Sequence, residues 1–223
     1  MGSEIRARLR GLYAITPESE DTASLVARVE QCLAGGAALV QYRAKRAGPA
    51  LAREQARRIA SLCRSFDVPF IVNDSIELAA ACGAQGVHLG RDDASVQEAR
   101  RALPGAIVGV SCYSDPRIAR AAAEAGADYV AIGSVFPSGT KPDAARAPLG
   151  CITEASRAGL PVAAIGGITL DNAQRALDAG ADMLAVISSL FDAADIRAAA
   201  RAFSDRFEDA DPQKRGQPQS RAL

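Results

Sequence analysis

The stretches AGADYV (residues 125–130) and AGADML (residues 179–184) are built alike: a helix end, a glycine and then an apolar run. Related stretches are AGGAALV at 34–40, ACGAQGV at 81–87 and AGLPV at 158–162. The glycine supplies the left-handed backbone conformation that ends a helix. A unit of this kind cannot cover both faces of its own strand. The repeat therefore predicts strands that share one parallel sheet covered by helices.

Around these stretches, short β-branched runs alternate with alanine-rich segments of helical period. We expect strands at 11–15, 38–42, 69–72, 86–89, 107–110, 128–132, 162–165 and 183–187. We expect helices at about 22–34, 49–65, 75–82, 94–102, 115–125, 149–158, 170–179 and 192–206. Eight such units predict an α/β fold, a single (β/α)8 TIM barrel, over residues 11–206. Residues 1–10 are then an N-terminal extension, and residues 207–223, which lack periodicity, a disordered tail.

A doubly wound open sheet is the alternative fold. It would call for G-x-G-x-x-G directly after the first strand, where this chain has AITPESED at 14–21. The barrel is therefore favoured.

Composition limits the class of protein. The 223 residues are 48% hydrophobic and carry zero formal net charge, which gives no sign of nucleic acid or an acidic membrane as a partner. The chain has no run of 18 apolar residues, so the sequence predicts no membrane span. The start MGSEIRARLR lacks the apolar core of a signal peptide. The five cysteines are widely spaced and form no C-x-x-C. We expect reduced thiols in a cytoplasmic protein, with neither disulfides nor a zinc site.

Polar residues gather after the carboxyl ends of the predicted strands, where the active site of a TIM barrel lies. The segments are QYRAK (41–45), NDS (73–75), HLGRDD (88–93), SCYSD (111–115), GSVFPSGTK (133–141), GGIT (166–169) and SSLF (188–191). The connections from helix to strand carry mainly glycine and alanine. This asymmetry predicts that one rim of the barrel performs chemistry.

Two lysines stand out in that rim. Lysine occurs only at positions 45, 141 and 214, although the chain has 26 basic residues. A lysine in a chain that otherwise uses arginine suggests a role that needs a compact point charge with rotatable donors. In QYRAK, the period of a strand directs Gln41, Arg43 and Lys45 to one side and Tyr42 to the other. An ordinary surface ion pair is the alternative reading of these cations.

Two pairs of polar residues admit two interpretations. Asn73 with Asp74, and Asp92 with Asp93, could cap the helices that follow them. Carboxylates from adjacent strand ends could instead converge on Mg²⁺, which usually takes one or two of them together with substrate phosphates. His88, the single histidine, lies inside a predicted strand. We expect it to pack or to support its neighbours rather than to activate a nucleophile.

The seventh and eighth predicted strands end in segments typical of a phosphate site. Gly166 and Gly167 let the backbone approach an anion closely, and Ser188 and Ser189 stand where a helix begins. Many TIM barrels bind phosphate in these two loops.

Taken in order, these segments resemble the thiamine-phosphate synthase family over nearly the whole barrel. The matching pieces are LYAITP, QYRAK, IVNDSIELA, GVHLGRDD, GVSCYS, AIGSVFPSGTKPDA, AAIGGIT and VISSLF. The resemblance implies a (β/α)8 transferase of thiamine biosynthesis. Such an enzyme joins hydroxymethylpyrimidine diphosphate to a thiazole phosphate, or its carboxylated form, and releases diphosphate, with Mg²⁺ as cofactor. The partners would be these two small phosphorylated substrates; whether the chain forms a homo-oligomer stays open.

The resemblance also implies roles for individual residues. The pyrimidine diphosphate site would comprise Gln41, Tyr42, Arg43, Ala44, Lys45, Asn73, Ser111 and Lys141, of which Arg43, Lys45, Ser111 and Lys141 would be catalytic. The metal ligands would be Asp74 and Asp93. The thiazole phosphate site would comprise Ser138, Gly139, Thr140, Gly167, Ile187 and Ser188. Two departures from the family pattern are Ala44, where an acidic residue is frequent, and Ser138, where threonine is usual.

Three alternatives remain at this stage. A thiazole tautomerase of the same fold would need an acid/base residue and could dispense with the carboxylates and the loop lysine. Another phosphate-binding barrel, such as an isomerase or a decarboxylase, is the second. The third is a barrel that only senses or scaffolds through its phosphate pocket.

Overall fold

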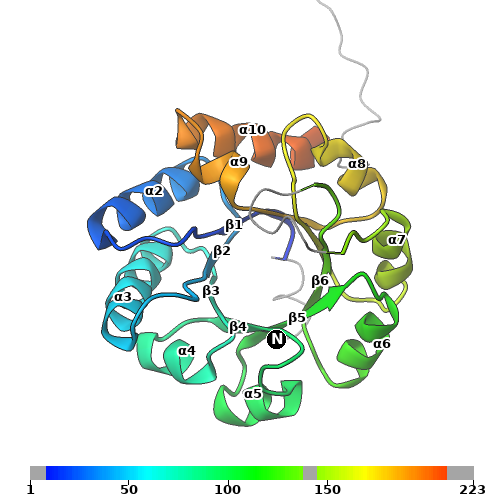
Figure 1. The fold of residues 1–223 in the computed structure, drawn as a ribbon, viewed down its shortest axis with the longest axis horizontal. Coiled ribbons are helices and arrows are strands. Elements are labelled where there is room, and N and C mark those ends of the chain that lie inside the picture. Colours follow the sequence, from blue (N-terminus) through cyan, green and yellow to red (C-terminus); the bar gives the residue numbers. More distant parts are fainter. Residues whose placement is uncertain (1–8, 138–144, 210–223) are drawn as a thin grey trace, which may run out of the picture.

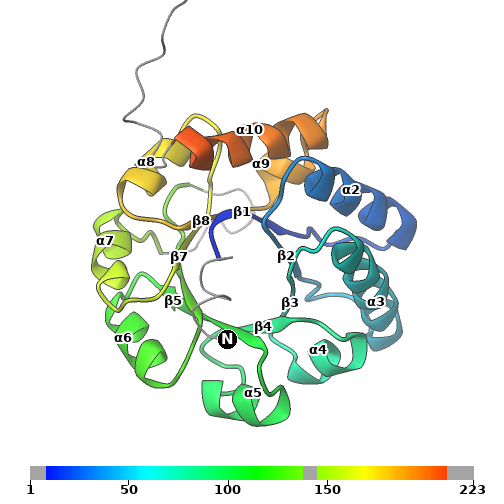
Figure 2. The ribbon, with the colours of Figure 1, turned by 180° about the vertical axis from the view of Figure 1, so that it is seen from behind.

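The structure is a computed structural model that describes residues 9–137 and 145–209. Eight parallel strands follow one another in chain order around a closed barrel, and β8 pairs with β1. Helices surround the strands in a ring (Figure 1), which the opposite view also shows (Figure 2). The predicted (β/α)8 barrel is confirmed. None of the helices in the described part of the chain has the length and apolar character that crossing a membrane requires.

The elements follow the expected order. The strands are β1 (Gly11–Ile15), β2 (Leu39–Tyr42), β3 (Phe70–Asn73), β4 (Gly86–Leu89), β5 (Ile107–Tyr113), β6 (Tyr129–Gly133), β7 (Val162–Ile165) and β8 (Met183–Val186). The helices are α2 (Thr22–Ala34), α3 (Pro49–Ser65), α4 (Ile76–Cys82), α5 (Val96–Ala102), α6 (Arg117–Glu124), α7 (Gly150–Ser156), α8 (Ala173–Asp178), α9 (Ser188–Phe191) and α10 (Ile196–Asp209). Three differences are the longer β5, a separate short helix α9 before the last helix, and the end of α10 at Asp209 rather than 206. The start of the tail expected at 207 is thus helical.

The core has two layers because both faces of each strand are covered. One set of side chains fills the barrel interior and includes Tyr13, Ile71 and Tyr129. The larger set lies between the strands and the helices and includes Val40 and Val72. Strands buried on both faces read as almost continuous apolar runs, which is how they were recognised in the sequence.

The repeated stretches have a structural role at the opposite rim from the polar segments. The side chain just before β4, β6 and β8 accepts a hydrogen bond from a backbone N–H at the start of the preceding strand. The three pairs are Gln85 with Phe70 (2.9 Å), Asp128 with Val108 (2.8 Å) and Asp182 with Val162 (2.9 Å). Gly126 and Gly180, which end the preceding helices, have φ of 91° and 101°, a region that glycine enters without strain. In these three repeats, a side chain thus fastens one strand to its neighbour.

Candidate active site

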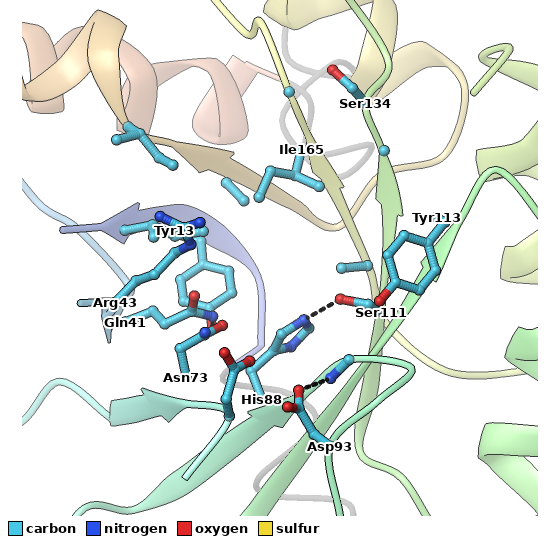
Figure 3. A pocket seen from close by; sticks show the side chains of 18 of the residues that line it. Tyr13, Gln41, Arg43, Asn73, His88, Asp93, Ser111, Tyr113, Ser134 and Ile165 are labelled. Atoms are coloured by element: carbon cyan, nitrogen blue, oxygen red, sulfur yellow. Dashed lines mark hydrogen bonds between the residues drawn. The ribbon is translucent and has the colours of Figure 1, made fainter. Parts of the chain in front are cut away.

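A cavity of about 290 Å³ opens at the carboxyl ends of the strands. Its lining includes seven residues that the resemblance assigned to the pyrimidine diphosphate and metal sites: Gln41, Arg43, Lys45, Asn73, Asp74, Asp93 and Ser111. They come from β2, β3 and β5 and from the loops that follow β2, β3 and β4 (Figure 3). Closure of the barrel thus brings together side chains that are up to 70 positions apart in the sequence.

A second cavity, of about 170 Å³, adjoins the first. Gly167, Ile187 and Ser188 line it, as expected for a phosphate site after β7 and β8. The two cavities share a wall, which consists of Ile165, Gly166, Ala185 and Ile187. Two ligands bound in these cavities would therefore lie next to one another.

The glycine pair after β7 is required by its surroundings. Gly166 and Gly167 have φ of 100° and 62°, and a Cβ on either would collide with Ser134 or with the backbone of Pro137. The loop after β6 lies against this turn, where the Phe136 N–H donates to the Gly166 carbonyl at 3.0 Å. Ser138, Gly139, Thr140 and Lys141, which follow in the same loop, lie outside the described residues.

The alternation predicted for QYRAK is confirmed. Gln41, Arg43 and Lys45 line the larger cavity, whereas the Tyr42 side chain is 2% exposed and points to the outer layer. The Tyr42 hydroxyl donates to Gln55 Oε1 at 2.8 Å. Tyr42 can therefore meet a ligand in the larger cavity only through its backbone. Ala44 borders a neighbouring cavity between α3 and α4 instead.

Two residues after β1 hold this segment in place, and the sequence reasoning missed both. The Glu18 carboxylate accepts the backbone N–H of Lys45 at 2.8 Å and that of Arg46 at 3.3 Å. It also lies 3.9 Å from Arg43 Nη1. The Thr16 hydroxyl accepts the Arg43 N–H at 2.9 Å. The signal that could have found them is the run TPES directly after the first strand, a position at the same rim.

Capping does not explain the two aspartates, so that interpretation was wrong. Ser75 caps α4 by accepting the Leu78 N–H, and Ser95 caps α5 in a capping box with Glu98. Asp74 and Asp93 instead line the cavity. Their carboxylates are left for a role at the site.

The aspartates form a crowded acidic pair. Partial burial raises the pKa of Asp93, and the neighbouring Asp74 carboxylate raises it further. A hydrogen bond from the Gly90 N–H, at 2.6 Å, and the charge of Lys45 oppose this rise in the Asp93 pKa. Lys45 Nζ lies 3.2 Å from Asp74 Oδ2. Two like charges in one site favour a cation, and hard carboxylate oxygens suit a divalent one. The described residues hold no group of three or more side chains that could bind a metal, so water or ligand oxygens would complete the coordination.

A chain of hydrogen bonds crosses the barrel interior. Gln41 Nε2 donates to the Tyr13 hydroxyl at 2.7 Å, and that hydroxyl lies 2.7 Å from the Tyr129 hydroxyl. His88 Nδ1 lies 3.0 Å from the Tyr129 hydroxyl, and His88 Nε2 lies 2.9 Å from Ser111 Oγ. Burial lowers the pKa of His88 to about 4, so the ring is neutral at pH 7. The supporting role expected for His88 agrees with these contacts, of which Figure 3 shows the hydrogen bond with Ser111.

Comparisons with known proteins show the family to which the chain belongs. A family model described as thiamine monophosphate synthase matches residues 12–190. A thiamine-phosphate synthase of Aromatoleum aromaticum is 58% identical over 90% of this chain and 98% of its own. One of Methylobacillus flagellatus is 54% identical over 89% of this chain and 96% of its own. The solved thiamine phosphate pyrophosphorylase of Pyrococcus furiosus superimposes with a TM-score of 0.83 at 36% identity, covering 92% of this chain and 98% of its own. The chain, with its two adjoining cavities on one rim of an eight-stranded barrel, belongs to the thiamine monophosphate synthase family.

Proposed function

We propose that this chain joins 4-amino-5-hydroxymethyl-2-methylpyrimidine diphosphate to 4-methyl-5-(2-phosphoethyl)thiazole, giving thiamine phosphate and diphosphate, or to the carboxylated form of the thiazole, which also loses its carboxyl group as CO2. One observation carries the proposal: two cavities with different linings share a wall at the catalytic rim. A reaction of two phosphorylated substrates needs two such compartments side by side. Membership of the family supports the same reaction.

The larger cavity suits the pyrimidine diphosphate. Gln41, Asn73 and Ser111 offer polar groups for the amino-substituted ring and its first phosphate. Arg43 and Lys45 contribute positive charge where negative charge grows as diphosphate departs. From the sequence, Lys141 belongs with them.

Asp74 and Asp93 would hold Mg²⁺. Their crowding and the hard oxygen donors fit this ion, which usually takes one or two protein carboxylates. When bound, Mg²⁺ supplies charge that neutralises the diphosphate oxygens. Lys45, already beside Asp74, is placed to follow the diphosphate as it separates.

The proposed chemistry needs no activated nucleophile from the protein. The bond between the methylene carbon and the diphosphate oxygen breaks, and the aminopyrimidine ring delocalises the positive charge left on that carbon. The thiazole nitrogen then donates its lone pair to the same carbon. This nitrogen has no proton to lose, so no general base is required. Phosphate binding in the smaller cavity holds the nucleophile in place, which lowers the barrier through position.

The test is an incubation of the purified chain with both substrates and Mg²⁺, followed by chromatography for thiamine phosphate and diphosphate. We expect equimolar products, and none when either substrate is omitted. A chain that isomerises the thiazole phosphate alone, without forming thiamine phosphate, would be a tautomerase. A chain that binds the substrates without turnover would be a sensor. Either result would reject the proposal.

A further inference from the structure

The chain of hydrogen bonds in the barrel interior connects Gln41 and Ser111, two residues assigned above to the pyrimidine diphosphate site. Between them lie Tyr13, Tyr129 and His88. Tyr13 and Tyr129 are 1% and 0% exposed, so their hydroxyl protons cannot be given to solvent. Each hydroxyl has one proton, and each must go to a neighbour in the chain. The direction of all the bonds is thereby coupled.

The direction follows from the Gln41 end. Because Gln41 Nε2 donates to the Tyr13 hydroxyl, the Tyr13 proton has to go to Tyr129. The Tyr129 proton then has to go to His88 Nδ1. A neutral imidazole with Nδ1 as acceptor carries its proton on Nε2. Nε2–H therefore donates to Ser111 Oγ.

At the other end, Ser111 Oγ already accepts a hydrogen bond from the imidazole. Its own proton is left to point into the cavity that Ser111 lines. We propose that Tyr129 is a positioning residue: through His88, it holds the Ser111 hydroxyl as a hydrogen-bond donor toward the departing diphosphate. This inference rests on the proposed function only in naming the ligand. The reverse chain, with the proton on Nδ1, would make Ser111 donate to the ring and present lone pairs to an anion.

The barrel is shaped around this tyrosine. Gly109 on β5 is paired in register with Tyr129 on β6. A Cβ on Gly109 would collide with the Tyr129 ring and hydroxyl, so only glycine leaves room for it. The Tyr13 and Tyr129 rings meet edge to face, with centroids 5.9 Å apart. Tyr129 is fully buried, so any effect on a ligand passes through its neighbours.

The first test uses the fact that the chain has a single histidine. In the ¹⁵N-labelled, substrate-free protein at pH 7.5, long-range ¹H–¹⁵N correlation reports which ring nitrogen carries the proton. We expect the proton on Nε2. Tyr129→Phe should move the ¹⁵N resonances of both ring nitrogens toward the values of a mixture of the two tautomers. Tyr42→Phe removes another buried tyrosine hydroxyl, one that does not belong to this chain of hydrogen bonds, and should leave the resonances of both His88 ring nitrogens unchanged. A proton on Nδ1 in the unaltered protein would overturn the proposal, whether or not the chain makes thiamine phosphate.

The second test separates positioning from a merely structural role. Tyr129→Phe should lower kcat about tenfold per folded molecule, as for loss of one oriented hydrogen bond, and leave the KM for the thiazole phosphate unchanged. In a Ser111→Ala background the same change should cost less than about twofold, because its target is gone. Circular dichroism gives the folded fraction. Multiplicative losses in the double variant, or an equal rise in both KM values, would mean that Tyr129 acts through packing, and would overturn the proposal.

Discussion

Asp93 accepts a hydrogen bond from the Gly90 N–H at 2.6 Å and faces Asp74 across the rim of the larger cavity. Neither aspartate caps a helix, because Ser75 and Ser95 occupy the N-cap positions. Partial burial, and then the like charge of Asp74, raise the pKa of Asp93, and a cation bound to the pair would relieve both effects.

We therefore expect Asp93→Asn to lower turnover by more than roughly a hundredfold, because the proposed Mg²⁺ loses a carboxylate ligand and the leaving diphosphate then loses the positive charge that neutralises it. Asparagine has nearly the same size, and the thermal midpoint should hardly change. Asp92→Asn removes the same charge one position away and is the matched control; its cost should stay below about threefold. Steady-state rates with both substrates give the comparison. Equal losses in the two variants would contradict the special role of Asp93.

At this scale the sequence predicted residues that face the rim but, apart from His88, not those that support them. Gln41, Arg43 and Lys45 were found because strand alternation fixes the side to which each points. Tyr13 and Tyr129 were missed because an aromatic residue in an apolar strand is indistinguishable from ordinary core. Which hydroxyls meet depends on how the barrel closes, and no local pattern records that. Lys141 and its neighbours from Ser138 stay predictions, since they lie outside the described residues.

Among the elements, the loop after β2 depends on the loop after β1. Glu18 binds the backbone N–H groups of Lys45 and Arg46 and lies near Arg43. Glu18→Ala should release this segment and raise the KM for the pyrimidine diphosphate about tenfold, the effect of losing one or two charge-assisted hydrogen bonds. The KM for the thiazole phosphate should not change. Exposed Glu20 provides the control substitution, Glu20→Ala. A uniform loss of kcat with both KM values unchanged would argue against a role in substrate binding.

Two of the side chains that fasten neighbouring strands at the opposite rim, Asp182 and Asp128, allow a matched test of stability. Burial raises the pKa of Asp182 in the folded protein above its value in the unfolded chain. Its contribution to stability is therefore fully present below the pKa of the unfolded chain and is lost as the pH rises through the pKa of the folded protein. Asp182→Asn keeps an oxygen for the Val162 N–H and removes the charge. The free energy of unfolding at pH 7 should rise by roughly 0.5 kcal/mol, and the gain should vanish below about pH 4, where the carboxyl of the unfolded chain is also protonated.

Asp128 occupies the equivalent position before β6, but its carboxylate forms an ion pair with Arg100. Its carboxylate lies 2.6 Å from Arg100 Nη2, and Arg100 also donates to the Ala106 and Gly126 carbonyls. Asp128→Asn should therefore lower the free energy of unfolding by about 2 kcal/mol at pH 7. Urea titrations at pH 7 and pH 4 measure both variants. Changes of the same sign for Asp128→Asn and Asp182→Asn at pH 7 would refute this account of the repeat.

Element order was predictable because period and glycine spacing are local signals. The exceptions have two different causes. α9 has only four residues, Ser188–Phe191, too few to show a helical period. β5 continues to Tyr113 because an irregularity between Ser111 and Tyr113 lets the strand keep pairing with β6. An irregular register of this kind depends on the neighbouring strand and leaves no mark in the sequence.

For the whole molecule, metal dependence should separate activity from folding. Asp74 and Asp93 lie at an open rim, away from the contacts that close the barrel. Removing divalent cations with a chelator should lower turnover by more than roughly a hundredfold, and added Mg²⁺ should restore it. The thermal midpoint of the substrate-free protein should move by less than about 2 °C, since a weakly held ion adds little stability. Full turnover in excess chelator would exclude the proposed metal role.

The central claim is that one rim of the barrel holds both phosphorylated groups, with diphosphate leaving beside the acidic pair. Diffraction from crystals grown with thiamine phosphate, diphosphate and Mg²⁺ tests it most directly. The account predicts metal density between Asp74 and Asp93, diphosphate against Arg43 and Lys45, and the phosphate of thiamine phosphate beside Gly167 and Ser188. Diphosphate bound elsewhere, or a metal ion with no contact to either aspartate, would contradict it.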